Sequence, residues 1–93
     1  MIIGFGCKNT EKIWNQEFSK KFPDSIQPLV LRKLIMINRA QNVNDLRTPP
    51  GNHLEKLQGS YKGFHSIRVN QQWRLVFKWK ANGAHEVALV DYH

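Results

Sequence analysis

Alternating side chains in the C-terminal third of the chain predict an antiparallel sheet. From residue 73 to residue 79 every odd position is apolar, and residues 67–69 continue the pattern on the preceding strand. A slip of one residue would turn apolar side chains to the wrong face, so the faces fix the register. A three-residue loop at 70–72 aligns the two strands, and it places Arg68 directly opposite Arg74.

A second turn, Ala81-Asn82-Gly83, precedes another alternating strand. We read it as a three-residue loop with Gly83 in the left-handed conformation, because this choice keeps the apolar faces aligned. The same register pairs Lys78 with Glu86 across the two strands, and opposite charges at such positions stabilise a sheet. The C-terminal third therefore predicts three consecutive antiparallel strands.

The N-terminal half reads as a short strand followed by two helices. Residues 2–5 are the strand candidate, and a helix is predicted over about 9–18. Apolar residues at three- to four-residue spacing predict a second helix over about 25–41, where Pro28 is tolerated because it falls in the first turn. Ninety-three residues make one domain, residues 1–93. The order β-α-α-β-β-β predicts an α+β fold, in which two helices pack on a small, mainly antiparallel sheet.

Charge and cysteine content limit the classes of function. The chain has 14 Lys and Arg against 7 Asp and Glu, a formal net charge of +7, which indicates an anionic partner such as nucleic acid or an acidic protein. Lysines of the predicted helices, Lys33 among them, are expected to face solvent. One cysteine, Cys7, excludes an internal disulfide and suits a reducing cytosol. Without a signal-peptide pattern or an apolar span, we expect a cytoplasmic protein with no membrane partner.

The histidine and glycine patterns give no reason to expect a metal or a cofactor. The four histidines, at positions 53, 65, 85 and 93, lack the spacing of zinc ligands. His65 alternates with the apolar face, so we expect it at the margin of the core. The sequence also lacks a glycine-rich phosphate loop. We therefore predict neither a metal site nor a cofactor.

The predicted register makes neighbours of two like charges, Arg68 and Arg74, and opposed like charges destabilise a sheet. Either both arginines point into solvent, or they share an external anion such as a phosphate. Tyr92 is predicted to lie diagonal to Arg74 on the same face, at the end of an apolar strand. Two plainer interpretations stay open: Tyr92 could merely cap the sheet, and His93 could be a frayed terminus.

The segment Gly63–Phe77, together with the terminal Asp91-Tyr92-His93, resembles the HigB branch of the RelE superfamily of bacterial toxins. Leu46–Asn52 and Leu54–Leu57 fit as well, so the resemblance covers most of the chain. It implies a microbial-RNase-like domain that enters the A site of the 70S ribosome and cleaves mRNA. It also implies a HigA-like helix-turn-helix antitoxin, and binding of operator DNA only through the toxin-antitoxin complex.

The resemblance also implies roles for individual residues. Arg74 matches the arginine expected to hold the scissile phosphate, and Arg68 would assist it. Metal-free cleavage requires a group that takes a proton, a group that gives one, and positive charge at the phosphoryl oxygens. We expect His93 to be the general acid or base and Tyr92 to orient the nucleotide. Asp91 would position a neighbour or accept a proton.

The general base stays open. Some relatives have a histidine and a lysine where this chain has Glu55 and Gln58, so Glu55 is a second candidate for the base. Asn52, His53 and Lys56 lie in the same segment, and we expect them to contact the RNA.

Two other classes of function remain. The chain could be a non-catalytic basic module that binds RNA or DNA, or an interaction domain for an acidic protein. Growth arrest on expression, relieved by an adjacent helix-turn-helix gene, would favour the toxin.

Overall fold

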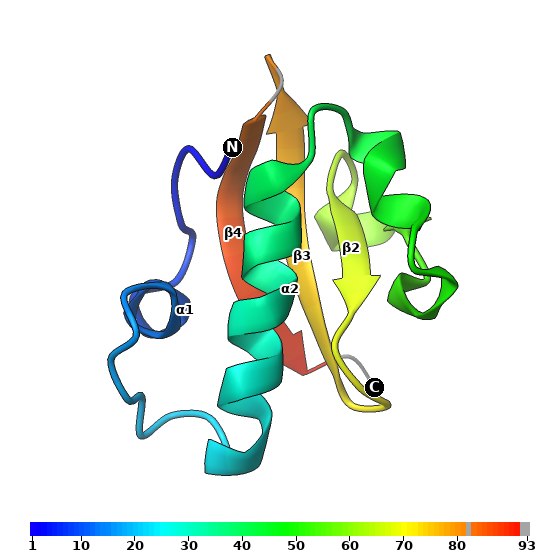
Figure 1. Cartoon of the computed structure of the whole chain (residues 1–93). Coiled ribbons are helices and arrows are strands. Elements are labelled where there is room, and N and C mark those ends of the chain that lie inside the picture. The colour runs from blue at the N-terminus through cyan, green and yellow to red at the C-terminus, as the bar shows by residue number, and fades with distance from the viewer. Residues whose placement is uncertain (82, 92–93) are drawn as a thin grey trace.

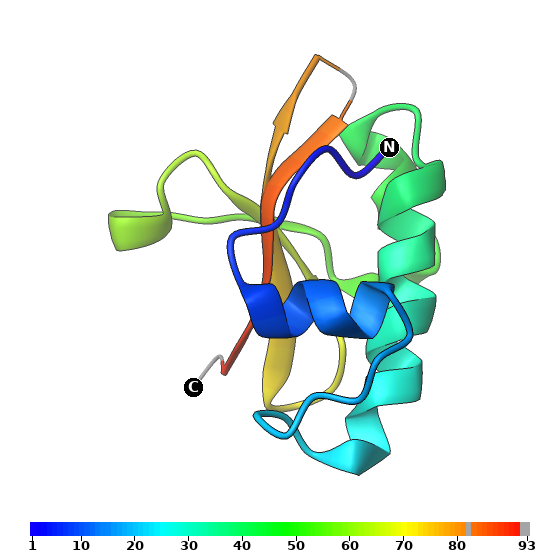
Figure 2. The same ribbon diagram turned by 90° about the vertical axis from the view of Figure 1, so that its left-hand side faces the viewer.

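Two helices cover one face of a four-stranded sheet in the computed structural model, which describes residues 1–81 and 83–91 (Figures 1 and 2). The sheet has the order β1-β2-β3-β4, and every neighbouring pair is antiparallel. This arrangement confirms the α+β expectation. The helices are α1 (Lys8–Trp14) and α2 (Gln27–Arg39), and the strands are β1 (Glu55–Lys56), β2 (His65–Arg68), β3 (Trp73–Lys80) and β4 (Gly83–Asp91). Four 3-10 turns link them: η1 (Asp24–Ile26), η2 (Val43–Arg47), η3 (Pro50–Asn52) and η4 (Gly59–Tyr61).

The core lies between α2 and the inner face of the sheet. Val30, Leu34 and Ile37 of α2 are fully buried, as their helical spacing predicts. Apolar residues of the sheet, Ile67, Leu75 and Phe77 among them, belong to the same buried cluster. Pro28 falls in the first turn of α2, as expected. The second predicted helix is therefore confirmed, with ends two residues inside those expected.

Helix α1 is shorter than predicted. It ends at Trp14, and Gln16 has a positive φ of 61°, which turns the chain away from the helical path. Phe18 is therefore not part of an apolar stripe, and its side chain is 59% exposed. The helix is tied to the sheet by Thr10, whose Oγ1 accepts a 3.0 Å hydrogen bond from the backbone N–H of Leu89.

The register between β2 and β3 is confirmed, with Arg68 opposite Arg74. The loop between them is held by the side chain of Asn70. Its Oδ1 accepts hydrogen bonds of 2.8 Å from the backbone N–H groups of Gln72 and Trp73. Asparagine favours such turns because its side chain can replace a backbone acceptor.

The turn between β3 and β4 differs from the prediction. Lys80 pairs with Gly83, so only positions 81 and 82 separate the strands, and position 82 lies outside the described residues. Lys78 consequently pairs with His85 rather than with Glu86. A bulge between Val76 and Lys78 then restores the expected alignment farther along the strands. The predicted charge pair still forms, because Glu86 Oε2 lies 3.3 Å from Lys78 Nζ.

The N-terminal segment, residues 2–5, forms two isolated parallel bridges to β4 rather than a regular strand. Gly83 is needed beside it, since a Cβ there would lie 2.5 Å from Cγ1 of Ile3. Across residues 1–81 and 83–91, the helices are too short or too polar to span a membrane.

Candidate active site

Arg74 of β3 is a buried, hydrogen-bonded cation on the outer face of the sheet, the face that the helices leave uncovered. Its side chain is 6% exposed, although arginine is seldom buried without partners. Nε donates a 2.8 Å hydrogen bond to Oγ of Ser66, and Nη2 donates to the backbone carbonyl of His53. The guanidinium group is therefore held in one orientation by β2 and by the loop before β1.

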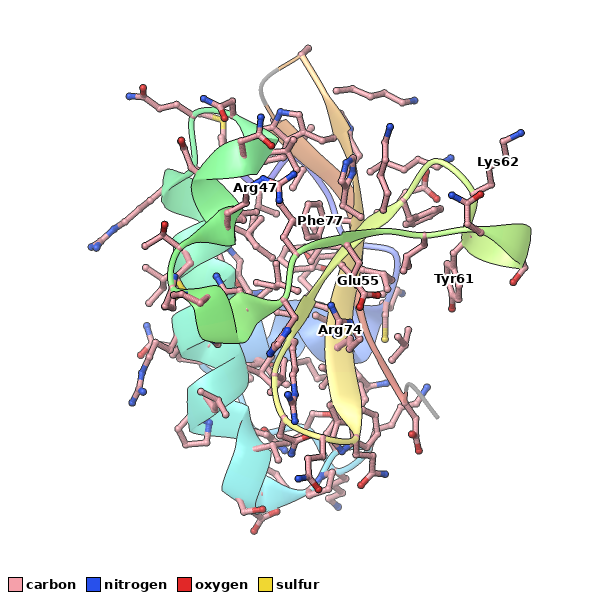
Figure 3. The ribbon with its side chains drawn as sticks, turned by 90° about the vertical axis from the view of Figure 1, so that its right-hand side faces the viewer. Arg47, Glu55, Tyr61, Lys62, Arg74 and Phe77 are labelled. Carbon is pink, nitrogen blue, oxygen red and sulfur yellow. The ribbon has the colours of Figure 1, made fainter. Side chains whose placement is uncertain are left out.

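Glu55 shares this outer face. It pairs with Ser66 across β1 and β2, and side chains of directly paired residues lie on the same side of a sheet. Ser66 in turn accepts a hydrogen bond from Arg74, so Glu55 and Arg74 are both neighbours of this serine. Figure 3 shows the Glu55 and Arg74 side chains close together in that view. The carboxylate of Glu55 is exposed. An exposed carboxylate and a fixed guanidinium thus occupy one small area.

Arg68 is the cross-strand neighbour of Arg74, but its side chain is hydrogen-bonded to a different part of the protein. Its Nε donates a 3.1 Å hydrogen bond to the carbonyl of Asn70. Because each guanidinium group has its own acceptors, the two like charges are accommodated without pointing together into solvent. The alternative in which both arginines point into solvent is wrong for Arg74, because Arg74 is buried.

Asn52 is buried, and its side chain forms hydrogen bonds inside the protein. It is 0% exposed, and its Oδ1 accepts a 2.6 Å hydrogen bond from Nζ of Lys33. Its Nδ2 donates to the carbonyl of Leu46 at 3.2 Å. The expected contact of Asn52 with RNA is therefore wrong, because its amide is consumed inside the protein. The expectation that Lys33 faces solvent is also wrong, and burial, assisted by Arg32, lowers the pKa of Lys33.

His53 and Lys56 are both exposed. His53 adopts a left-handed conformation with a φ of 44°, which turns its carbonyl toward Arg74. Lys56 pairs with His65, and neighbouring residues of a strand alternate between faces, so Lys56 and Glu55 point to opposite sides. Of the predicted RNA contacts, His53 thus touches the site through its backbone.

Asp91 at the end of β4 pairs with Trp73, on the face of the sheet opposite to Arg74. Its Oδ2 accepts a 3.0 Å hydrogen bond from Nε2 of Gln72. Val90, the residue before it, is the partner of Arg74, so β4 runs directly beside the site. The predicted catalytic residues Tyr92 and His93 lie outside the described residues.

Sequence reasoning missed Ser66, which is 0% exposed and orients Arg74. The available signal was that Ser66 is a small polar residue two positions before Arg68, on the same face of the predicted strand. In the part of the chain that the structure describes, His, Cys, Asp and Glu side chains form no group of three that could hold a metal ion.

Comparison with known families decides the class of this protein. A family model described as the RelE-like toxin HigB of type II toxin-antitoxin systems matches residues 4–93. The chain belongs to this family. The HigB-like toxin is also 53% identical over 80 residues to Toxin HigB-1 of Vibrio cholerae serotype O1, a match that covers 85% of this chain and 84% of that protein. The resemblance noted in the sequence is thereby confirmed.

Solved structures agree with this assignment at the level of fold. The HigB-like toxin matches a chain of the YoeB-YefM complex from Staphylococcus aureus with a TM-score of 0.61 and 23% identity, covering 100% of this chain and 98% of the other. It matches a mutant of YafQ from E. coli with a TM-score of 0.63 and 15% identity, covering 98% and 93%. At such identities the likeness shows the fold alone, which is RelE-like.

Proposed function

We propose that this HigB-like toxin is an endoribonuclease that cleaves mRNA in the ribosomal A site. A 2′-hydroxyl of the RNA would attack the adjacent phosphorus, and the 5′-oxygen of the next nucleotide would leave. The observation that carries the proposal is the buried and doubly anchored guanidinium group of Arg74 beside the exposed carboxylate of Glu55.

Arg74 would stabilise the negative charge that develops on the phosphoryl oxygens. A donor that is already oriented costs no reorganisation when the reaction occurs, and it acts more strongly where water is excluded. Arginine suits this task because it stays charged and its planar fork matches phosphate oxygens. Its bonds to Ser66 and to the His53 carbonyl supply the required rigidity.

Glu55 would take the proton from the 2′-hydroxyl, and His93 would give a proton to the leaving oxygen. A carboxylate can act as a general base when it lies within hydrogen-bond reach of the attacking group. Glu55 is accessible to the RNA because it is exposed on the same face of the sheet as Arg74. Tyr92 would orient the nucleotide, and Asp91 would position the chain end. Arg68 and His53 would add contacts to the RNA.

The net charge of +7 supports the ribosome as the place of action, because ribosomal RNA presents a dense field of phosphates. For the antitoxin we propose a HigA-like helix-turn-helix protein, with operator DNA bound only through the complex. The S. aureus relative was solved as a toxin-antitoxin complex, YoeB-YefM, which supports a protein partner in general terms. All of these partners belong to the bacterial cytoplasm, which is the compartment that we propose.

The experiment compares the wild type with Arg74→Ala, Glu55→Gln and a deletion of His93. Each protein is added to purified 70S ribosomes that hold a defined mRNA, and the 5′ ends of the products are mapped by primer extension. We expect the wild type to cut inside the translated frame, only when ribosomes are present, and each variant to lose at least about tenfold in rate. Wild-type cleavage by both Arg74→Ala and the His93 deletion would refute the assignment. Binding to RNA without any cleavage would favour the non-catalytic module.

A further inference from the structure

The connection between β1 and β2 forms an arm, residues Leu57–Phe64, that projects from the sheet on the side away from α2 (Figures 2 and 3). Its base is closed by a 2.9 Å hydrogen bond from the N–H of Leu57 to the carbonyl of Phe64. Its tip is the 3-10 turn η4, whose first residue, Gly59, has a positive φ of 66°, and Gly63, two residues after the turn, has a positive φ of 91°. The arm is therefore a defined structure, anchored by the buried side chain of Leu57.

The tip of this arm presents an aromatic ring. Tyr61 is 37% exposed, which makes it one of the large apolar side chains on the surface. Its ring meets Phe64 edge to face, with centroids 5.5 Å apart, and Nζ of Lys78 lies 5.1 Å from the centroid of Phe64. Tyr61 extends from the same side of the arm as Glu55 and Arg74, whereas Lys62 points the other way (Figure 3).

Basic residues outnumber acidic residues in the sequence that contains the arm. Between Glu55 and Glu86 the sequence holds no acidic residue, but it holds six basic residues: Lys56, Lys62, Arg68, Arg74, Lys78 and Lys80. A cavity of about 260 Å³ at the base of the arm is lined in part by Lys56, Lys62 and His65. The Nδ1 atom of His65 is buried without a hydrogen-bond partner among the described residues. Buried polar atoms usually have a partner, so the wall of the cavity holds one unsatisfied polar atom.

We propose that the arm is a second contact site for single-stranded RNA, in which Tyr61 stacks on a base on one side of the tip, while Lys62 and Lys56 bind phosphates of the same strand on the other side. The proposal rests on the function proposed above and extends it to the nucleotides beside the cleaved bond. Exposed aromatic rings within a positive surface are the combination that binds single strands, because every base has a face that can stack. An acidic protein would form ion pairs with the lysines, but its binding would not require a base to stack on the Tyr61 ring.

The test measures binding separately from cleavage. The probe is a fluorescein-labelled single-stranded RNA of about 12 nucleotides, fully 2′-O-methylated so that it cannot be cut, and binding is followed by fluorescence anisotropy. We expect Tyr61→Ala to raise Kd about tenfold and Tyr61→Phe to leave it within about twofold, because phenylalanine still stacks. Lys56→Ala with Lys62→Ala should reduce the slope of log K against log salt by about 1.4. The matched control, Lys8→Ala with Lys20→Ala, removes two exposed lysines elsewhere and should change the slope far less.

An unchanged Kd for Tyr61→Ala would overturn the proposal, as would equal damage from Tyr61→Phe, which would point to the hydroxyl rather than to stacking. Absence of binding by the wild type at about 100 μM protein would overturn it too. Wild-type affinity of the lysine variant for RNA, with weaker binding to polyglutamate, would assign the arm to an acidic protein instead. Failure of the cleavage proposal is distinguishable, because the wild type would then leave mRNA intact on ribosomes while the arm variants still lower RNA affinity.

Discussion

Nε of Arg74 and Oγ of Ser66 lie 2.8 Å apart, in a hydrogen bond that is buried between β2 and β3. Ser66 thereby fixes the direction of the guanidinium group without itself being exposed. This pair makes the orientation of Arg74 a property of the sheet rather than of the RNA.

Replacement of Ser66 by alanine tests that role. The guanidinium group would lose the acceptor of its Nε, and hydrogen bonds to charged groups contribute about 1.5–3 kcal/mol. We expect Ser66→Ala to lower the free energy of unfolding by about that amount in urea titrations, and to slow mRNA cleavage more than it weakens RNA binding. Ser25→Ala, at an exposed serine, is the control and should stay within about 0.5 kcal/mol of the wild type. Equal stability and cleavage in both variants would show that Arg74 is held by other contacts.

The buried pair of Lys33 and Asn52 is predicted to fix the loop before β1 to helix α2. The 2.6 Å bond joins a buried ammonium group to an amide oxygen, so removal of the amide leaves a charge without its acceptor. We expect Asn52→Leu to destabilise the fold by about 2–3 kcal/mol in urea titrations. The double variant Asn52→Leu with Lys33→Met removes both polar partners, and it should be more stable than Asn52→Leu alone. Strictly additive effects of the two substitutions would contradict this coupling.

Stability should also depend on pH through His65. Burial, with the positive charge of Lys56 in addition, lowers the pKa of His65 below its ordinary value of 6.5. As the pH falls below about 6.5, the unfolded chain therefore binds a proton that the folded protein does not, and the free energy of unfolding decreases. Above that pH both states hold a neutral imidazole, so the contribution to the slope disappears.

The measurement for this prediction is the urea midpoint between about pH 7.5 and about pH 5.5. His65→Phe keeps a ring that can stack on Phe77, whose centroid lies 6.2 Å from that of His65 in the wild type. We expect this variant to lose part of the decrease in stability that the wild type shows. His53→Asn, at an exposed residue in the left-handed conformation, should keep the wild-type profile. Parallel profiles for all three proteins would exclude His65 as the cause.

Apolar alternation in the sequence predicted which side chains share a face of the sheet. It failed where contacts between segments distant in the sequence determine the structure. Alternation was enough to place Arg68 opposite Arg74. The predicted three-residue turn ending at Gly83 was wrong. The glycine is required instead because Ile3, near the N-terminus, packs too close to position 83 for a Cβ. Periodicity alone carries no information about such an approach.

The candidate site shows the same division. Arg74 and Glu55 were identified from the sequence, but the carbonyl of His53 became a partner of Arg74 only through the left-handed turn that ends η3. Asn52, an expected RNA contact, is instead buried and hydrogen-bonded to Lys33, which lies 19 residues earlier in the chain. A polar residue in a loop looks the same in sequence whether it faces RNA or holds the loop in place.

The two paired arginines should respond differently to replacement by lysine, although both substitutions keep the charge. Lysine at position 74 is a single point donor, so it cannot reach both the Ser66 hydroxyl and the His53 carbonyl while also facing a phosphate. We expect Arg74→Lys to reduce ribosome-dependent cleavage by about 100-fold, comparable to the loss of one preorganised donor in other active sites. Arg68→Lys should reduce cleavage by less than about threefold, because an ammonium group can replace Nε as the donor of the hydrogen bond to the Asn70 carbonyl. Primer extension on programmed 70S ribosomes gives both rates. Similar losses in the two variants would mean that the arginines act together on one phosphate, and that the rigid anchoring of Arg74 has no separate role in the reaction.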